Sequence, residues 1–177
     1  MTEEKVIATI KKTMPAVVSI VITKHLEDLE KEIPKELYPF LPMGPHGPQL
    51  QIPDQLVDKR GMVQIGGGSG FIVGTNGVIL TNKHVVSDAK AEYTVLMDDG
   101  RKFPAEILTR DPINDVAILR IKADNLPILE LGNSSNLELG QTVIAIGNAL
   151  GIFKNTVSLG IISGLSRVIS AQADPAS

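Results

Sequence analysis

The first residues of the chain alternate apolar and charged positions with the period of an α-helix. Apolar side chains recur at spacings of three and four residues, at Val6, Ile7, Ile10 and Met14. Acidic residues precede this run and lysines close it, which is the order that the helix dipole favours. Proline at position 15 ends the pattern, so we expect a short N-terminal helix within residues 1–15.

A strand and then a long insertion are predicted next. Residues 16–23 form an apolar, β-branched run bounded by proline and lysine, which favours a buried strand. The following stretch, 24–65, is charged at first and then holds six of the eleven prolines. A segment this long between core elements is uncommon, so we expect a mobile, Pro-rich loop inserted into the domain.

From residue 66 onward the pattern is one of short strands separated by turn signals. Asn76-Gly77 and Asp99-Gly100 each separate two β-rich runs, as in two-residue hairpins. Further strands are expected at 92–97, 102–108, 116–121, 128–131, 142–146, 156–162 and 167–170. Strands so closely spaced, without helical patterns between them, indicate an all-β barrel or sandwich.

Composition agrees with a folded chain and excludes several classes of function. The 177 residues are 43% hydrophobic and 21% charged, with a formal charge of -3 and no cysteine. The charge balance gives no reason to expect a nucleic-acid partner, and thiolate chemistry and disulfides are excluded. The chain has no apolar run of about 18 residues and does not begin like a signal peptide, so we expect no membrane segment.

One histidine stands out as a candidate for chemistry. His25 lies among charged residues and His46 in a Pro-Gly loop, so both are interpreted as solvated surface residues. His84 instead follows a predicted strand and opens an apolar pair. Asp115 begins the apolar run DVAILRI, so we expect its carboxylate to be partly buried and to need a donor such as an imidazole N–H. This order suits a Ser-His-Asp system.

Four ordered segments together resemble the HtrA/Deg family of trypsin-like serine proteases. They are GSGFIVGTNGVILTNKHVV (68–86), DPINDVAILRI (111–121), LGNSSNLELGQTVIAIGNALG (131–151) and VSLGIISGLSR (157–167). The resemblance implies a trypsin-like double β-barrel, with a complete first barrel at 16–140 and only the opening strands of a second at 141–177. It aligns His84 and Asp115 with the catalytic histidine and aspartate. Ala149 departs from the proline common after GN in the family.

The resemblance stops short of a nucleophile. In the family this serine lies in a GNSGG motif of the second barrel, and no serine of this chain has that context; they are Ser19, Ser69, Ser87, Ser134, Ser135, Ser158, Ser163, Ser166, Ser170 and Ser177. Ser69, in GGGSGF, comes nearest and is interpreted as a Gly-rich strand entry. The oxyanion hole accompanies the nucleophile. We therefore expect the chain to be inactive alone, with second-barrel strands that are poorly packed or paired with another chain.

The leading hypothesis is the N-terminal part of an HtrA-like serine endopeptidase. Family resemblance implies unfolded or misfolded protein substrates, no cofactor, a homotrimer, downstream PDZ domains and an extracytoplasmic location with a signal or anchor missing here. The alternative is a non-catalytic, protease-like scaffold for oligomerisation or peptide binding, favoured by the missing serine. A metal site at His25 with Glu27 and Asp28 lacks an HExxH pattern, and the glycines at 66–70 lack the following lysine of a phosphate loop.

Overall fold

The structure, a computed structural model, describes residues 2–44, 47–147 and 156–165. Its helices are α1 (Glu3–Thr13) and α2 (Leu26–Lys31), with 3₁₀ turns η1 (Met14–Ala16), η2 (Lys35–Phe40), η3 (Asp54–Leu56), η4 (Lys83–Val86) and η5 (Ser134–Asn136). Its strands are β1 (Val17–His25), β2 (Met43–Gly44), β3 (Gly47–Pro48), β4 (Met62–Gly74), β5 (Val78–Thr81), β6 (Glu92–Leu96), β7 (Lys102–Arg110), β8 (Ala117–Ile121), β9 (Thr142–Gly147) and β10 (Thr156–Ile161).

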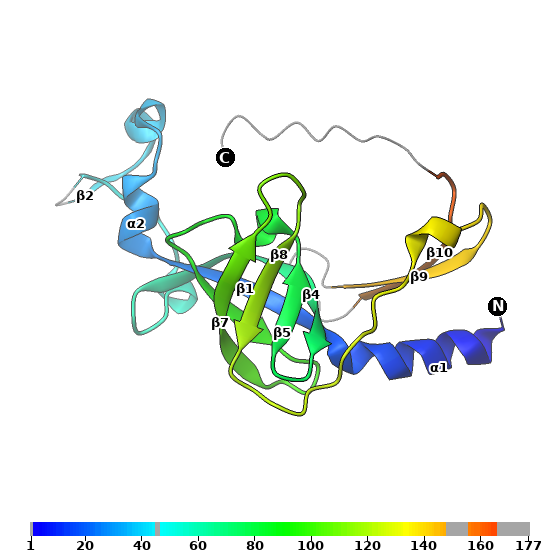
Figure 1. The fold of residues 1–177 in the computed structure, drawn as a ribbon. Coiled ribbons are helices and arrows are strands. Elements are labelled where there is room, and N and C mark those ends of the chain that lie inside the picture. The colour runs from blue at the N-terminus through cyan, green and yellow to red at the C-terminus, as the bar shows by residue number, and fades with distance from the viewer. Residues whose placement is uncertain (1, 45–46, 148–155, 166–177) are drawn as a thin grey trace.

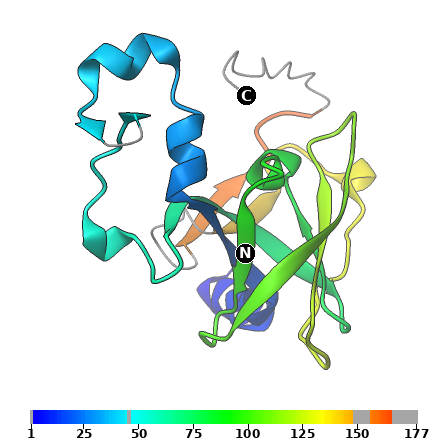
Figure 2. The same ribbon diagram turned by 90° about the vertical axis from the view of Figure 1, so that its left-hand side faces the viewer.

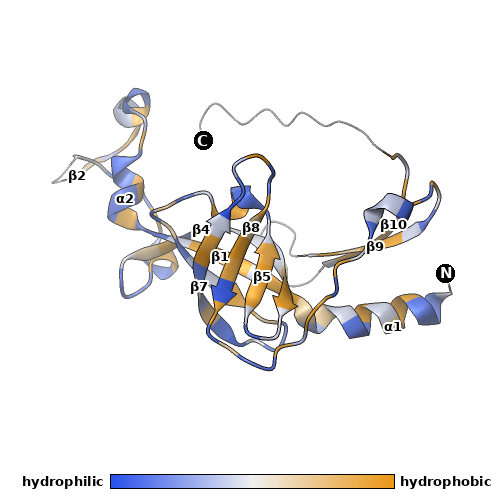
Figure 3. Ribbon diagram, viewed as in Figure 1, coloured by the Kyte–Doolittle hydropathy of each residue, from blue (hydrophilic) through white to orange (hydrophobic). Residues whose placement is uncertain are grey.

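Six of these strands close into a barrel, as the sequence predicts. Their order around the barrel is β1-β4-β5-β8-β7-β6, and β6 pairs back onto β1. Apolar residues alternate along the strands, so that Ile20, Ile79 and Leu119 point inward and are fully buried. Figure 1 shows the barrel at the centre of the molecule and Figure 3 shows its hydrophobic strands.

Glycines of β4 make room for the core and for the turn that follows β5. A Cβ atom built on Gly68 would lie 2.5 Å from Val85 Cγ1, and one on Gly70 would lie 2.9 Å from the carbonyl oxygen of Leu80. Cβ atoms in proteins essentially never approach other atoms this closely, so neither glycine can be replaced without a shift of its neighbours. The Gly-rich part of β4 is therefore a packing requirement of the barrel wall, and through Val85 it fixes where η4 lies.

The predicted N-terminal helix is present as α1. It ends at Thr13, and Pro15 lies in the short turn η1 that leads into β1. None of its residues is buried, and the helix projects from one end of the barrel (Figure 1).

The segment between β1 and β4 is better organised than the long loop that the sequence predicts. It contains α2, η2, η3 and the short pair β2–β3, and it leaves the barrel as an open loop (Figure 2). Its two ends are joined in the barrel wall, where the amide of Leu26 donates to the carbonyl of Gly61 at 2.9 Å. Phe40, near the far end of the loop, is 84% exposed.

Two details of the strand prediction are wrong. Residues 128–131 form no strand; Leu129 is held instead by one backbone bond to the carbonyl oxygen of Ile72, at 2.8 Å. Neither predicted two-residue hairpin has two connecting residues, because Gly74 pairs with Val78 and the amide of Met97 donates to the carbonyl of Arg101. Each connection therefore has three residues, and the last is a glycine with positive φ, Gly77 or Gly100. The strand expected at 167–170 lies outside the described residues.

Beyond the barrel, β9 and β10 form a two-stranded antiparallel sheet. Every residue of β10 is exposed, including Leu159 at 61% and Ile161 at 60%. Among the residues that the structure describes, no helix is both long and apolar enough to cross a membrane.

Replacement of Gly77 by alanine is expected to destabilise the barrel strongly. Gly77 has φ +89°, and a Cβ there would lie 2.2 Å from the carbonyl oxygen of Ile121. Backbone strain and the clash together should lower the free energy of unfolding by about 3 kcal/mol in urea denaturation. Gly100 is the matched control, since it has the same φ and an equivalent turn bond but open space around it. Gly100→Ala should cost only about 1 kcal/mol, and an equal loss in the two variants would contradict this account.

Candidate active site

His84 lies on η4, a single turn that directly follows β5. Asn82 precedes the turn, and its carbonyl oxygen accepts a hydrogen bond from the amide of Val85 at 3.2 Å. Val85 and Val86 are buried, at 9% and 0% exposure, whereas the His84 side chain is 71% exposed. The turn thus anchors itself with two valines and presents the imidazole at the surface.

Asp115 lies at the end of the connection between β7 and β8. Asp111 organises this connection: its Oδ1 accepts hydrogen bonds from the amides of Ile113 and Asn114, both at 2.7 Å. The amide of Asp111 donates to the carbonyl of Val116 at 2.8 Å, which closes the turn. Because β8 pairs with β5 in the barrel, this turn delivers Asp115 next to η4.

The carboxylate of Asp115 holds His84 in two ways. Oδ1 accepts from the backbone N–H of His84 at 2.9 Å, and Oδ2 lies 2.6 Å from the imidazole Nδ1. The side-chain amide of Asn82 also donates to Oδ2, and to the Asp115 carbonyl, both at 3.1 Å. Backbone and ring of His84 are therefore oriented by one side chain.

The expected burial of Asp115 is wrong. Its side chain is 47% exposed, because it precedes the first inward-pointing residue of β8, Ala117, and lies outside the barrel wall. Hydrogen bonding, rather than withdrawal from water, stabilises this carboxylate.

The arrangement selects one tautomer of the neutral imidazole. A carboxylate only accepts hydrogen bonds, so the ring nitrogen facing Asp115, Nδ1, must carry the proton. Nε2 is then left with a lone pair that can accept a proton from another group. If the ring becomes protonated, the same carboxylate stabilises the imidazolium. These are the two functions of the aspartate in a Ser-His-Asp system.

Electrostatics keeps Asp115 ionised. The backbone N–H of His84 makes the largest contribution that lowers the pKa of Asp115, followed by the His84 ring and the Asn82 amide. Residual desolvation opposes them and is outweighed. Since the folded-state pKa lies below the usual value for aspartate, this interaction stabilises the fold at and above that usual value and is lost as pH falls through the lowered pKa.

Other candidate residues do not join this pair. His25 lies at the end of β1, before α2, and His46 lies outside the described residues. Ser69 lies in β4, where its carbonyl accepts from the Thr81 hydroxyl at 2.7 Å, as expected for a strand residue. No group of three or more metal-ligating side chains occurs within the described ranges.

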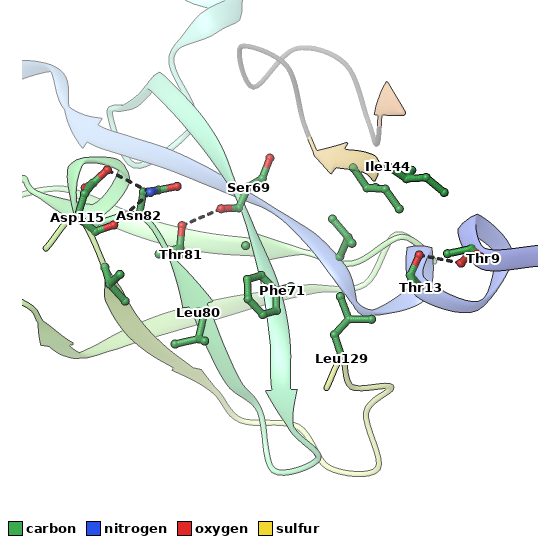
Figure 4. Close-up of a pocket in the computed structure, with 14 residues that line it drawn as sticks. Thr9, Thr13, Ser69, Phe71, Leu80, Thr81, Asn82, Asp115, Leu129 and Ile144 are labelled. Atoms are coloured by element: carbon green, nitrogen blue, oxygen red, sulfur yellow. Dashed lines mark hydrogen bonds between the residues drawn. The ribbon is translucent and has the colours of Figure 1, made fainter. Parts of the chain in front are cut away.

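A cavity of about 520 Å³ adjoins Asp115, with walls from β4 and β5 of the barrel, from α1 and from β9. Figure 4 shows it running from Asp115 and Asn82, past Ser69 and Phe71 of β4, towards Ile144 of β9. Its walls are mostly apolar, with Asp115 and Asn82 at one end and Thr9 and Thr13 at the other (Figure 4).

Sequence reasoning missed the residues that support the pair. The side chain of Asn82 donates a hydrogen bond to Asp115, and the carboxylate of Asp111 accepts hydrogen bonds from the turn that carries Asp115. Their positions carry a usable signal, because asparagine after a strand and Asp-Pro at the start of a turn are both typical of residues that cap backbone groups.

Comparison with known proteins places this geometry in context. A family model described as a trypsin-like peptidase domain matches residues 68–177. The probable periplasmic serine endoprotease DegP-like of Pseudomonas fluorescens is 36% identical in an alignment of 168 positions that covers 89% of this chain and 34% of that protein. A protein of the same name from Halomonas elongata is 47% identical over 102 residues, covering 58% of this chain and 21% of its own length.

A solved structure of the HtrA-type protease AlgW with a tripeptide is also similar. It aligns with a TM-score of 0.62 and 29% identity over 90% of this chain and 40% of its own chain. The chain thus spans about a third of the length of the Pseudomonas relative and somewhat more of the solved structure.

Removal of the His84 side chain should leave the pKa of Asp115 below the usual aspartate value. The largest cause is the backbone N–H, which His84→Ala retains. We expect a partial rise of the Asp115 pKa in His84→Ala and a smaller rise in Asn82→Ala, measured by ¹³C carboxyl NMR between about pH 2 and 6. A return to the usual value in His84→Ala would contradict the dominant role of the backbone bond.

Proposed function

Because the chain belongs to the HtrA family of trypsin-like serine proteases, we propose that it supplies the general base and its partner, His84 and Asp115, to a serine endopeptidase. The observation that carries this proposal is the 2.6 Å contact between Nδ1 and Oδ2, reinforced by the backbone bond at 2.9 Å. In this mechanism Nε2 of His84 accepts the proton of a serine hydroxyl as the hydroxyl attacks a peptide carbonyl, and later returns it to the leaving amine.

The nucleophile is proposed to lie outside these 177 residues. None of the ten serines has the GNSGG context, and a trypsin-like oxyanion hole is built from backbone N–H groups beside the nucleophile. We therefore propose that this chain is inactive alone and that the first barrel works together with a further part of the protein.

Substrate and location follow from the family rather than from the site. The relatives from Pseudomonas and Halomonas are named as periplasmic endoproteases. We propose unfolded or misfolded proteins as substrates, an extracytoplasmic location and a homotrimeric assembly for the whole protein.

The gene provides the first test. Its sequence beyond codon 177 should encode GNSGG in frame, because the proposed mechanism requires that serine. A stop codon at that position would contradict the proposal and would favour a non-catalytic scaffold that binds peptides or forms oligomers.

Activity provides the second test. In the full-length protein, His84→Ala or Asp115→Asn should lower kcat/KM for unfolded casein by about 10³-fold or more, since each removes the base or its orientation. The 177-residue chain alone should cleave no casein. His25→Ala is the control, because His25 is the last residue of β1 and does not lie beside Asp115; it should retain wild-type activity. Undiminished cleavage by the His84 variant would exclude it as the base.

A further inference from the structure

Lys24 of β1 is a buried charge. It is 2% exposed, and its ammonium group contacts two carboxylates, with Glu32 Oε2 at 2.5 Å and Asp88 Oδ2 at 2.6 Å. A buried ammonium without such partners is strongly unfavourable, so neither carboxylate can move away without cost. The three side chains act as one unit.

The three residues come from segments that are far apart in the sequence. Lys24 lies in the barrel wall, Glu32 directly after α2 in the long insertion, and Asp88 between η4 and β6. Lys24 thus joins the insertion to the stretch that begins with His84.

Asp88 closes the stretch that carries His84. The carbonyl of Asp88 accepts from the Tyr93 hydroxyl at 2.7 Å, and the carbonyl of Val86 accepts from Arg110 Nε at 2.6 Å. At the other end, Asp115 holds the amide of His84 at 2.9 Å. The five residues from His84 to Asp88 are thus held at both ends, by Asp115 at His84 and by Lys24 at Asp88.

The ionisation of Lys24, Glu32 and Asp88 favours the contact between them. Burial acts to lower the pKa of Lys24, but hydrogen bonds to Asp88 and Glu32 outweigh it and raise that pKa. The bond from Lys24 is also the largest cause that lowers the pKa of each carboxylate. All three groups are therefore charged at neutral pH.

We propose that Lys24 is a positioning residue for His84, and that through Glu32 it couples the placement of the imidazole to the insertion at 26–61. The proposal rests on the proposed function only in treating His84 as the base. It assigns a role to a side chain that contacts neither His84 nor Asp115 directly.

The test is Lys24→Met in the 177-residue chain, followed by NMR. We expect hydrogen exchange of the His84 amide to accelerate about 10-fold or more and the ¹⁵N shifts of the ring to show less of the Nδ1–H tautomer. A merely structural role would instead accelerate exchange of barrel amides such as that of Leu119 and leave the tautomer of the folded protein unchanged. That result would overturn the proposal.

Lys90→Met is the matched control. The Lys90 side chain is 62% exposed and also pairs with Glu32, at 3.1 Å, so this ion pair joins the same two segments as Lys24 but contributes less to stability. Lys90→Met removes the same charge as Lys24→Met. It should leave the His84 ring unchanged, and an effect equal to that of Lys24→Met would contradict the assignment.

Two further variants decide the question if Lys24→Met does not fold. Asp88→Asn acts on the His84 side and Glu32→Gln on the insertion side of Lys24, and both carboxylates are partly exposed. Both should shift the His84 tautomer. No shift in Asp88→Asn would refute positioning, and no shift in Glu32→Gln alone would refute coupling to the insertion. These signals need no cleavage, so they remain informative even if the proposed protease activity is absent.

Discussion

The site depends first on a steric condition in the barrel wall. Gly68 has no side chain, and Val85 occupies the space that a Cβ atom would need. With Val85 and Val86 packed in this way, η4 is fixed against the barrel although it makes a single turn. His84 then has to point outward, because its neighbours on the turn take the inward positions. The glycine-rich strand thus determines the location of the imidazole before any hydrogen bond to it is considered.

Hydrogen bonds provide the orientation that packing alone does not. The His84 and Asp115 side chains are both well exposed, so the attraction between their charges is weakened by water. Their geometry rests instead on several directional bonds that meet at one carboxylate, two from His84 and one from Asn82. One of these bonds comes from the backbone and is independent of the protonation of the ring. The pair is therefore pre-oriented in either charge state of the imidazole.

The sequence predicts what depends on local pattern. Alternating apolar residues and turn glycines predict an all-β barrel or sandwich, and the family resemblance narrows this to a barrel. The positions of His84 and Asp115 at the ends of predicted strands indicate that they can meet. The burial of Asp115 and a strand at 128–131 are predicted wrongly, because both depend on which neighbours cover a segment. The contacts of Lys24 are not predictable in this way: Asp88 is far away in the sequence, and a lysine in a strand is usually exposed.

A large insertion can coexist with the closed barrel because its two ends meet between paired strands. The insertion leaves after β1 and returns into β4, two strands that pair with each other, and its ends are joined by the bonds between Leu26 and Gly61 and between Asp58 and Met62. Its length therefore does not strain the wall. Lys24 lies just before this exit, where β1 is still paired with Val63 of β4 but its pairing with β6 has ended at Thr23. At that point its ammonium group contacts both Glu32 of the insertion and Asp88, which follows η4, while the six strands of the barrel remain paired.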